Sequence, residues 1–142
     1  MTTKLEGQKI DQYLIQKFIA RGGMADVFQA EDVNLKRRVA LKIMLDSLSQ
    51  DAQFTERFRR EAQTVARLNH ANIVQIYGAG VTPDGRPYLA MQFIEGGSLR
   101  DNLHKWEAQN KIVPTTQALA IVRPIAEALG VAHQAGIVHR DI

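Results

Sequence analysis

Two features in the first half of the chain have residue types suited to holding a phosphate group. Gly22-Gly23 separates two apolar runs, and Lys42 ends the segment Val39-Ala40-Leu41-Lys42. A glycine turn lets backbone N–H groups approach phosphate oxygens without a β-carbon in the way. A lysine whose stem packs on a sheet presents a fixed cation to the same oxygens. Taken singly, the glycines also fit an ordinary hairpin turn, and the lysine fits a solvated strand.

An acidic residue on the next predicted element is the third candidate. Glu61 lies between Phe58 and Ala62, toward one flank of an apolar stripe, where its carboxylate could reach back and hold Lys42. The ordinary alternative is a surface charge that pairs locally with Arg57, four residues earlier on the same helix. We therefore expect a Lys42–Glu61 ion pair only if Lys42 has a functional role.

Two segments in the second half complete the set. The strand-like run from Tyr88 to Ile94 leads through Gly96-Gly97 into a helix that Ser98 can cap, as in a hinge whose free backbone groups bind a purine edge. The triplet His139-Arg140-Asp141 follows a long helical pattern. Each segment alone is common, so the order of all five features along the chain carries the weight.

The elements that position these residues are strands first and helices later. Apolar runs and alternation predict strands over five segments: Tyr13 to Ala20, Val27 to Ala30, Arg38 to Ile43, Ile73 to Tyr77 and Pro87 to Ile94. Spacings of three and four predict an amphipathic helix on a further set of residues: Phe54, Phe58, Ala62, Val65 and Leu68. Beyond Gly97 we expect one helix from Ser98 to Trp106, and a longer one capped by Thr115 or Thr116 that ends before Gly136.

Composition excludes several classes of protein. The 142 residues are 45% hydrophobic and 23% charged, which is typical of a globular domain. The net charge of +3 is too small to indicate a nucleic-acid or membrane partner, and without cysteine there is no disulfide, Cys-ligated metal or thiol nucleophile. No signal peptide or membrane-spanning run occurs, so we expect a cytoplasmic location, with a membrane span beyond residue 142 left open.

Together these features resemble a eukaryotic-like bacterial protein serine/threonine kinase, from about Tyr13 to the last residue. Ile19 to Val27 resembles the loop G-x-G-x-x-G-x-V with only its middle glycine kept, Val39 to Lys42 matches V-A-I-K, and His139 to Asp141 matches H-R-D. The resemblance implies an α+β, protein-kinase-like fold. That fold has a five-stranded antiparallel N-lobe with one helix (αC), followed by the first helices of a truncated α-helical C-lobe. The implied domains are an N-terminal extension (1–12), the N-lobe (13–95) and the start of the C-lobe (96–142).

The resemblance also implies roles in binding ATP and in phosphorylating protein substrates. Lys42 would hold the α- and β-phosphates and pair with Glu61, and Asp141 would be the catalytic base. Val27 and Ala40 would cover the adenine. The remaining ATP-binding residues would be those of the glycine turn and the hinge: Ala20, Arg21, Gly22, Gly23, Met24, Ala25, Met91, Gln92 and Ile94.

Magnesium is implied as a cofactor, but no metal ligand is expected within the 142 residues. In the family, the asparagine and the D-F-G aspartate that hold the metal follow the catalytic base, and neither motif occurs here. We therefore expect no kinase turnover from this polypeptide alone. The alternative is a non-catalytic, kinase-like module that binds a nucleotide or a partner. An unrelated nucleotide-binding fold is disfavoured, because G-x-x-x-x-G-K-[ST] is absent and the glycines join two strands.

Overall fold

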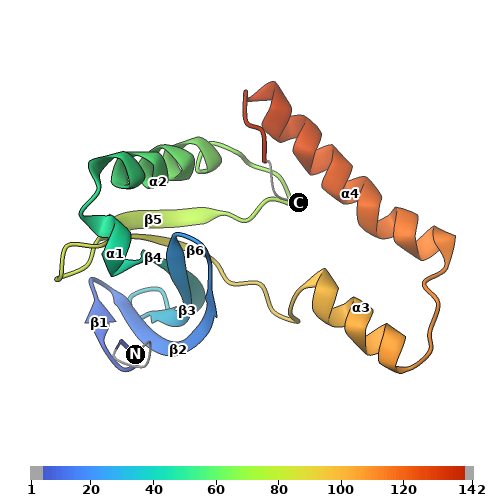
Figure 1. Ribbon diagram of the computed structural model, residues 1–142, viewed down its shortest axis with the longest axis horizontal. Coiled ribbons are helices and arrows are strands. Elements are labelled where there is room, and N and C mark those ends of the chain that lie inside the picture. The colour runs from blue at the N-terminus through green and yellow to red at the C-terminus, as the bar shows by residue number, and fades with distance from the viewer. Residues whose placement is uncertain (1–4, 140–142) are drawn as a thin grey trace. The chain divides into compact units, whose positions relative to one another are not determined.

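The computed structural model describes residues 5–139 and divides into two compact units. The first unit contains Met1–Arg67 and Val74–Phe93, and the second contains Leu68–Ile73 and Ile94–Ile142. A β-sheet and two helices make up the first unit, and two further helices make up most of the second (Figure 1).

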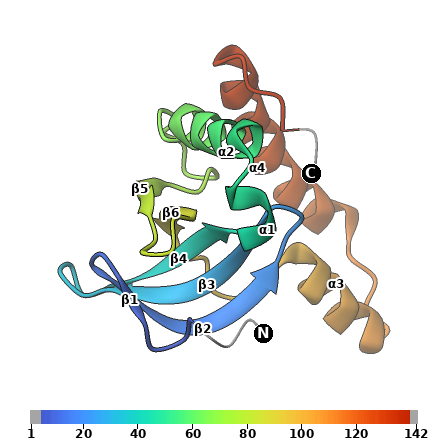
Figure 2. The ribbon, with the colours of Figure 1, turned by 60° about the vertical axis from the view of Figure 1, so that its left-hand side comes forward.

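The first unit is built on a six-stranded antiparallel sheet with the order β1-β2-β3-β4-β6-β5. Its strands are β1 (Lys9–Ile10), β2 (Tyr13–Arg21), β3 (Ala25–Asp32), β4 (Arg37–Met44), β5 (Ile76–Val81) and β6 (Pro87–Gln92). Figure 2 shows β2, β3 and β4 curving alongside one another. The sequence predicted five of these strands. The sixth, β1, contains only two residues, too few to show an alternating pattern.

The fourth predicted strand is displaced along the chain. We expected it over Ile73 to Tyr77, whereas β5 runs from Ile76 to Val81 and includes Gly78 and Gly80. Glycine is depleted in strands because it loses more backbone entropy on folding than other residues do and has no side chain to pack. The sequence pattern of β5 was therefore weak at the place where the strand forms.

Two apolar clusters lie on opposite faces of this sheet. The first cluster is built around the buried residues Tyr13, Phe28, Leu41, Ile43 and Tyr88. The second cluster joins the sheet to a helix and consists of Ala25, Met44, Phe58, Ala62 and Leu89. Because successive strand residues point to opposite faces, Ile43 and Met44 belong to different clusters.

Helix α2 (Ala52–Val65) follows the short helix α1 (Asp46–Ser49) and packs on β5 and β6 (Figure 1). It begins at Asp51, whose side chain accepts a hydrogen bond from the backbone N–H of Gln53 at 2.8 Å. Phe58 and Ala62 are its buried residues, one helical turn apart, as the amphipathic pattern predicted.

The second unit contains α3 (Leu99–Ala108) and α4 (Thr115–Gln134). Ser98 caps α3 as predicted, and Asp101 completes the capping box by accepting the Ser98 backbone N–H at 2.7 Å. The predicted threonine cap of α4 is wrong, because the extended residue before the helix is Pro114 and Thr115 is already helical. Gly136, with φ +78°, follows the end of α4 as expected. Across residues 5–139, none of the helices is both long and apolar enough to cross a membrane.

Candidate nucleotide-binding site

The strand register brings several of the predicted ATP-binding residues into one row. Ala20 is the direct cross-strand partner of Val27, Val27 pairs with Lys42, and Lys42 pairs with Leu89. Side chains of directly paired residues lie on the same face of a sheet. Leu89 belongs to the apolar cluster beneath α2, so this row faces the same side as that helix.

A second row on the same face contains two more of the predicted residues. Ala40 pairs with Gln29 on β3 and with Met91 on β6. Ala40 is buried, and Met91 is partly buried against the cluster beneath α2. The two rows together form what we call the ligand face: Ala20, Val27, Ala40, Lys42 and Met91.

Lys42 provides the positive charge of the ligand face. Its side chain is half-buried, and its Nζ lies 5.8 Å from the centroid of the Phe58 ring on α2. Within residues 5–139, no acidic side chain lies close enough to form an ion pair with it. Phe58, for which we expected only a packing role, therefore also provides an aromatic face for this ammonium group.

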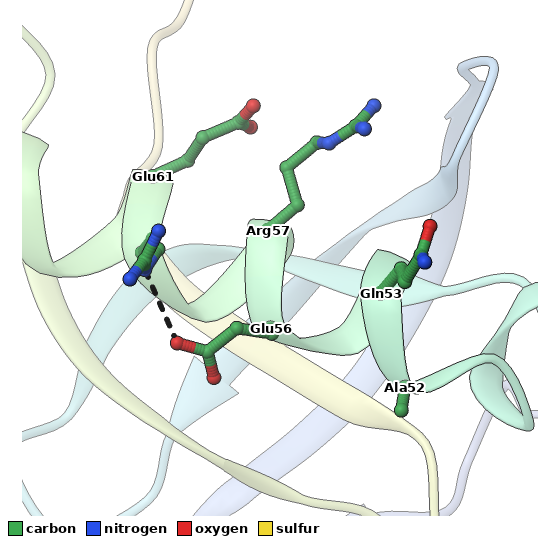
Figure 3. Close-up of a pocket in the computed structure, with 6 residues that line it drawn as sticks. Ala52, Gln53, Glu56, Arg57 and Glu61 are labelled. Atoms are coloured by element: carbon green, nitrogen blue, oxygen red, sulfur yellow. Dashed lines mark ion pairs between the residues drawn. The ribbon is translucent and has the colours of Figure 1, made fainter.

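The expected ion pair between Lys42 and Glu61 is not formed in the described part of the chain. Phe58 and Ala62 occupy the buried side of α2, which leaves Glu61 exposed. Figure 3 shows the Glu61 and Arg57 side chains extending from the same side of the helix. The local alternative, an ion pair between Glu61 and Arg57, is not formed among the described residues either.

Two hollows open on the surface of α2, and neither one is the ligand face. The first, of about 470 Å³, is lined by residues of α2 alone and includes Glu56, Arg57, Arg60 and Glu61 (Figure 3). Glu56 pairs there with Arg60 at 3.2 Å. The second, of about 520 Å³, lies between α2 and the β5–β6 pair. Apart from Glu61, none of the predicted ATP-binding or catalytic residues lines either hollow.

The glycine turn joins β2 to β3 and is tied down by backbone hydrogen bonds. The N–H of Gly22 donates to the carbonyl of Ala25 at 2.8 Å, and the N–H of Leu45 donates to the carbonyl of Met24 at 2.9 Å. Neither Gly22 nor Gly23 has a positive φ, so the turn itself does not require glycine there. A β-carbon on Gly23 would meet nothing within 4 Å, and the backbone is therefore open to a ligand.

Arg21 points away from the ligand face, which corrects its expected place in the site. Its cross-strand partner is Asp26, whose neighbours Ala25 and Val27 face α2. Arg21 Nε and Nη2 donate to the two carboxylate oxygens of Asp26 at 2.7 and 2.8 Å. The hydrogen bonding to Asp26 is the main reason that the pKa of Arg21 is raised above its usual value. We did not single out Asp26 from the sequence, although opposite charges on both sides of a turn were a visible signal.

Three predicted site residues remain: Gln92, Ile94 and Asp141. The backbone N–H of Gln92 donates to the carbonyl of Gln75 at 2.8 Å, so it is already used within the first unit. Ile94 belongs to the second unit and is exposed. Asp141 lies outside the described residues.

Comparison with known proteins identifies the chain's relatives. The protein kinase domain family matches residues 13–142. Serine/threonine-protein kinase PknL of Mycobacterium tuberculosis is 44% identical over 140 residues, which are 97% of this chain and 34% of that protein. Serine/threonine-protein kinase PknB of Mycobacterium leprae is 39% identical over 135 residues, which are 93% of this chain and 21% of that protein. The chain thus spans about a third or less of these relatives.

Solved structures agree with the predicted fold class. The crystal structure of the M. tuberculosis PknI kinase domain matches with a TM-score of 0.79 and 28% identity. The match covers 96% of this chain and 53% of the PknI chain. The protein-kinase-like α+β fold is thereby confirmed, with six strands in place of five. Since the family match extends over most of its length, the chain belongs to the protein kinase domain family.

Proposed function

We propose that this chain is the ATP-binding part of a protein serine/threonine kinase, which transfers the γ-phosphate of ATP to serine or threonine hydroxyls of proteins. Family membership and the names of its relatives support this class of reaction. The single observation that carries the nucleotide site is the ligand face, where small and apolar side chains surround one half-buried lysine. An apolar surface suits a purine, and an adjacent cation suits the phosphates attached to it.

Each residue of the ligand face has a defined role in the proposal. Val27 and Ala40 would cover the adenine, and Met91 would bound the adenine pocket at the end of β6. Lys42 would hold the α- and β-phosphates, and backbone groups of Gly22 and Gly23 would cover them. The hydrogen-bonded N–H of Gln92 would take no part, which leaves the backbone carbonyl of Gln92 and the N–H of Ile94 for the adenine edge.

Asp141 is proposed as the base of the transfer step. The substrate hydroxyl oxygen would form a bond to the γ-phosphorus while the bond from that phosphorus to the β–γ bridging oxygen breaks. The hydroxyl proton would pass to the Asp141 carboxylate. Glu61 would assist only if its side chain turned from the exposed side of α2 toward Lys42.

The described residues do not fit a magnesium site. Within residues 5–139 there is no group of three or more histidine, cysteine, aspartate or glutamate side chains placed to hold a metal. No step is therefore assigned to magnesium in this chain.

We propose that the purified polypeptide transfers no phosphate by itself. Metal-dependent transfer from radiolabelled ATP above a Lys42→Met control would overturn this proposal. We also propose, from the sequence alone, that the chain works in the cytoplasm.

ATP binding can be tested by titrating the full chain with ATP in a calorimeter. Lys42→Met should weaken the affinity by about tenfold to hundredfold, since a hydrogen bond to a charged group contributes roughly 1.5–3 kcal/mol. Lys111→Met is the matched control, because Lys111 is exposed and belongs to the second unit, whereas the residues of the ligand face belong to the first. Absence of ATP binding by the unsubstituted chain, or equal losses in both variants, would contradict the proposed site.

The DNA downstream of codon 142 tests the alternative, non-catalytic module. An in-frame continuation that encodes a D-F-G motif supports the kinase. A stop codon at that position supports a module that binds a nucleotide or a partner without catalysis.

A further inference from the structure

A bidentate ion pair between Arg21 and Asp26 joins β2 and β3 at the base of the glycine turn. Arg21 is the last residue of β2, and Asp26 is the second residue of β3. Their Cα atoms are directly paired across the strands, and Arg21 Nε and Nη2 donate to separate carboxylate oxygens at 2.7 and 2.8 Å. Such a pair fixes the orientation of both side chains, because the planar guanidinium group and the carboxylate have to be coplanar.

The two partners differ in their exposure to solvent. The Asp26 side chain is 8% exposed, and the Arg21 side chain is 58% exposed. A carboxylate that is buried without a partner costs free energy, so Asp26 depends on Arg21 for its place in the sheet. Arg21 has no such dependence, since water can solvate its guanidinium group.

The ion pair lies on the face of the sheet opposite to the ligand face. Asp26 is paired with Ile43, and Ile43 is paired with Tyr88; both belong to the apolar cluster on the far side from α2. The neighbouring residue, Val27, is paired with Lys42 on the ligand face. Arg21 and Asp26 can therefore affect a ligand only through the backbone that connects them.

That backbone is the glycine turn itself. Only four residues separate Arg21 from Asp26, and the hydrogen bond from Gly22 N–H to the Ala25 carbonyl lies directly inside the ion pair. The open backbone at Gly23 is thus held from one side by the ion pair, and it is held from the other by the contact of Leu45 N–H with the Met24 carbonyl. A turn ordered in advance loses less conformational entropy when it binds a ligand.

We infer that Arg21 and Asp26 are positioning residues that hold the glycine turn in its phosphate-covering geometry from outside the site. The inference rests on the proposed binding of ATP, and it deepens that proposal by assigning the ion pair to the phosphates and not to the nucleoside. The pair touches no ligand. Breaking it should loosen the turn and weaken the binding of phosphate groups, while the surface that holds the adenine stays intact.

The test compares ATP with adenosine, which has no phosphate, as ligands of the full chain. Asp26→Asn should weaken the affinity for ATP by about threefold to tenfold, as expected for the loss of a charge-assisted bidentate pair. The affinity for adenosine should change by less than about twofold, since the effect of the pair on the nucleoside is indirect. Hydrogen exchange at the Gly22 amide should become faster in the same variant.

Arg21→Lys is the second variant, and it allows the inference to be tested if the Asp26→Asn variant does not fold. Lysine retains the positive charge beside the buried carboxylate but cannot make two parallel hydrogen bonds. We therefore expect a smaller loss of ATP affinity than in Asp26→Asn, and no loss of adenosine affinity. Arg123→Gln is the matched control, because it removes an exposed Arg–Glu pair of 2.9 Å on α4. The control should leave both affinities unchanged.

Three results would overturn the inference. Equal losses for ATP and adenosine would mean that the ion pair only stabilises the sheet. An unchanged affinity for ATP in both variants would mean that the turn keeps its geometry without the pair. If the unsubstituted chain bound neither ligand, the proposed function would fail and the inference would fail with it; that result differs from the other two because it does not depend on a substitution.

Discussion

The hydroxyl group of Tyr88 occupies the space that a side chain on Gly80 would need. A β-carbon built on Gly80 would lie 2.6 Å from the Tyr88 hydroxyl oxygen and 2.7 Å from two ring carbons. The two residues are direct cross-strand partners on β5 and β6. The ring cannot move aside freely, because Tyr88 is buried, stacks edge-on against Tyr13 with centroids 5.9 Å apart and donates a hydrogen bond to Asp11.

Gly80→Ala should therefore destabilise the first unit. Forcing an extra methyl group into a packed site costs roughly 1–3 kcal/mol, and the midpoint of urea unfolding would measure it. Gly23→Ala is the control, since a β-carbon there meets nothing within 4 Å and the residue does not have a positive φ. An unchanged midpoint in Gly80→Ala would show that Tyr88 can move at little cost.

Tyr88 also makes the stability of the first unit decrease at alkaline pH. Burial raises the pKa of Tyr88 above its usual value of 10.0, and the hydrogen bond to Asp11 and the charge of that carboxylate raise it further. A group whose pKa is higher in the folded state contributes stability that is complete below the unfolded pKa. The contribution is lost as the pH rises through the folded pKa. We expect the first unit to weaken progressively above pH 10.0.

Tyr88→Phe should make this alkaline loss shallower, because the variant has no phenol that ionises on unfolding. Urea unfolding at several pH values above 10.0 measures the slope. A smaller slope should remain, since burial also raises the pKa of Tyr13, helped by the charge of Asp32. An identical slope in the variant and the unsubstituted chain would mean that Tyr88 does not control the alkaline transition.

Much of the sheet was predictable, because its strands are half-buried and alternate clearly. Val39, Leu41 and Ile43 were expected on one face of the third predicted strand, and all three are fully buried in one cluster. The position of β5 was not predictable in the same way. Its glycines are tolerated because Tyr13 and Tyr88 fill the space above them, a relation between residues far apart in the sequence.

The sequence proposed residues for the candidate site, but it did not show on which face of the sheet each side chain lies. Motif spacing identified Val27, Ala40 and Lys42, and the strand register places all three on one face. The sequence could not show that Arg21 turns to the opposite face, because a register shift in β2 between Phe18 and Ala20 changes the alternation just before it.

The separation of Lys42 from Glu61 leads to a third prediction. Because Glu61 is exposed and forms no ion pair in the described part of the chain, Glu61→Gln should change the free energy of unfolding by less than about 0.5 kcal/mol. It should also weaken ATP binding less than Lys42→Met does. Calorimetric titration and urea unfolding of both variants measure the two effects. Equal losses of ATP affinity would mean that the pair forms once the nucleotide binds.

Asp32 supports the last prediction, because it organises the turn between β3 and β4. It is 1% exposed, and its Oδ1 accepts hydrogen bonds from the backbone N–H groups of Asn34 and Leu35, each at 3.1 Å. Its other oxygen lies 3.8 Å from Nε of Arg37, whose guanidinium group stacks 3.6 Å from the centroid of the Tyr77 ring. One carboxylate thus serves two backbone donors and one cation.

Asp32→Ala should cost the first unit about 1–3 kcal/mol, since it leaves backbone donors without their acceptor. Asp32→Asn should cost less, because the amide oxygen can still accept both hydrogen bonds. Asp46→Ala, at an exposed position in α1, is the control for the loss of a negative charge. If Asp32→Asn were as destabilising as Asp32→Ala in urea unfolding, the charge facing Arg37 and not the turn would be the main contribution of Asp32.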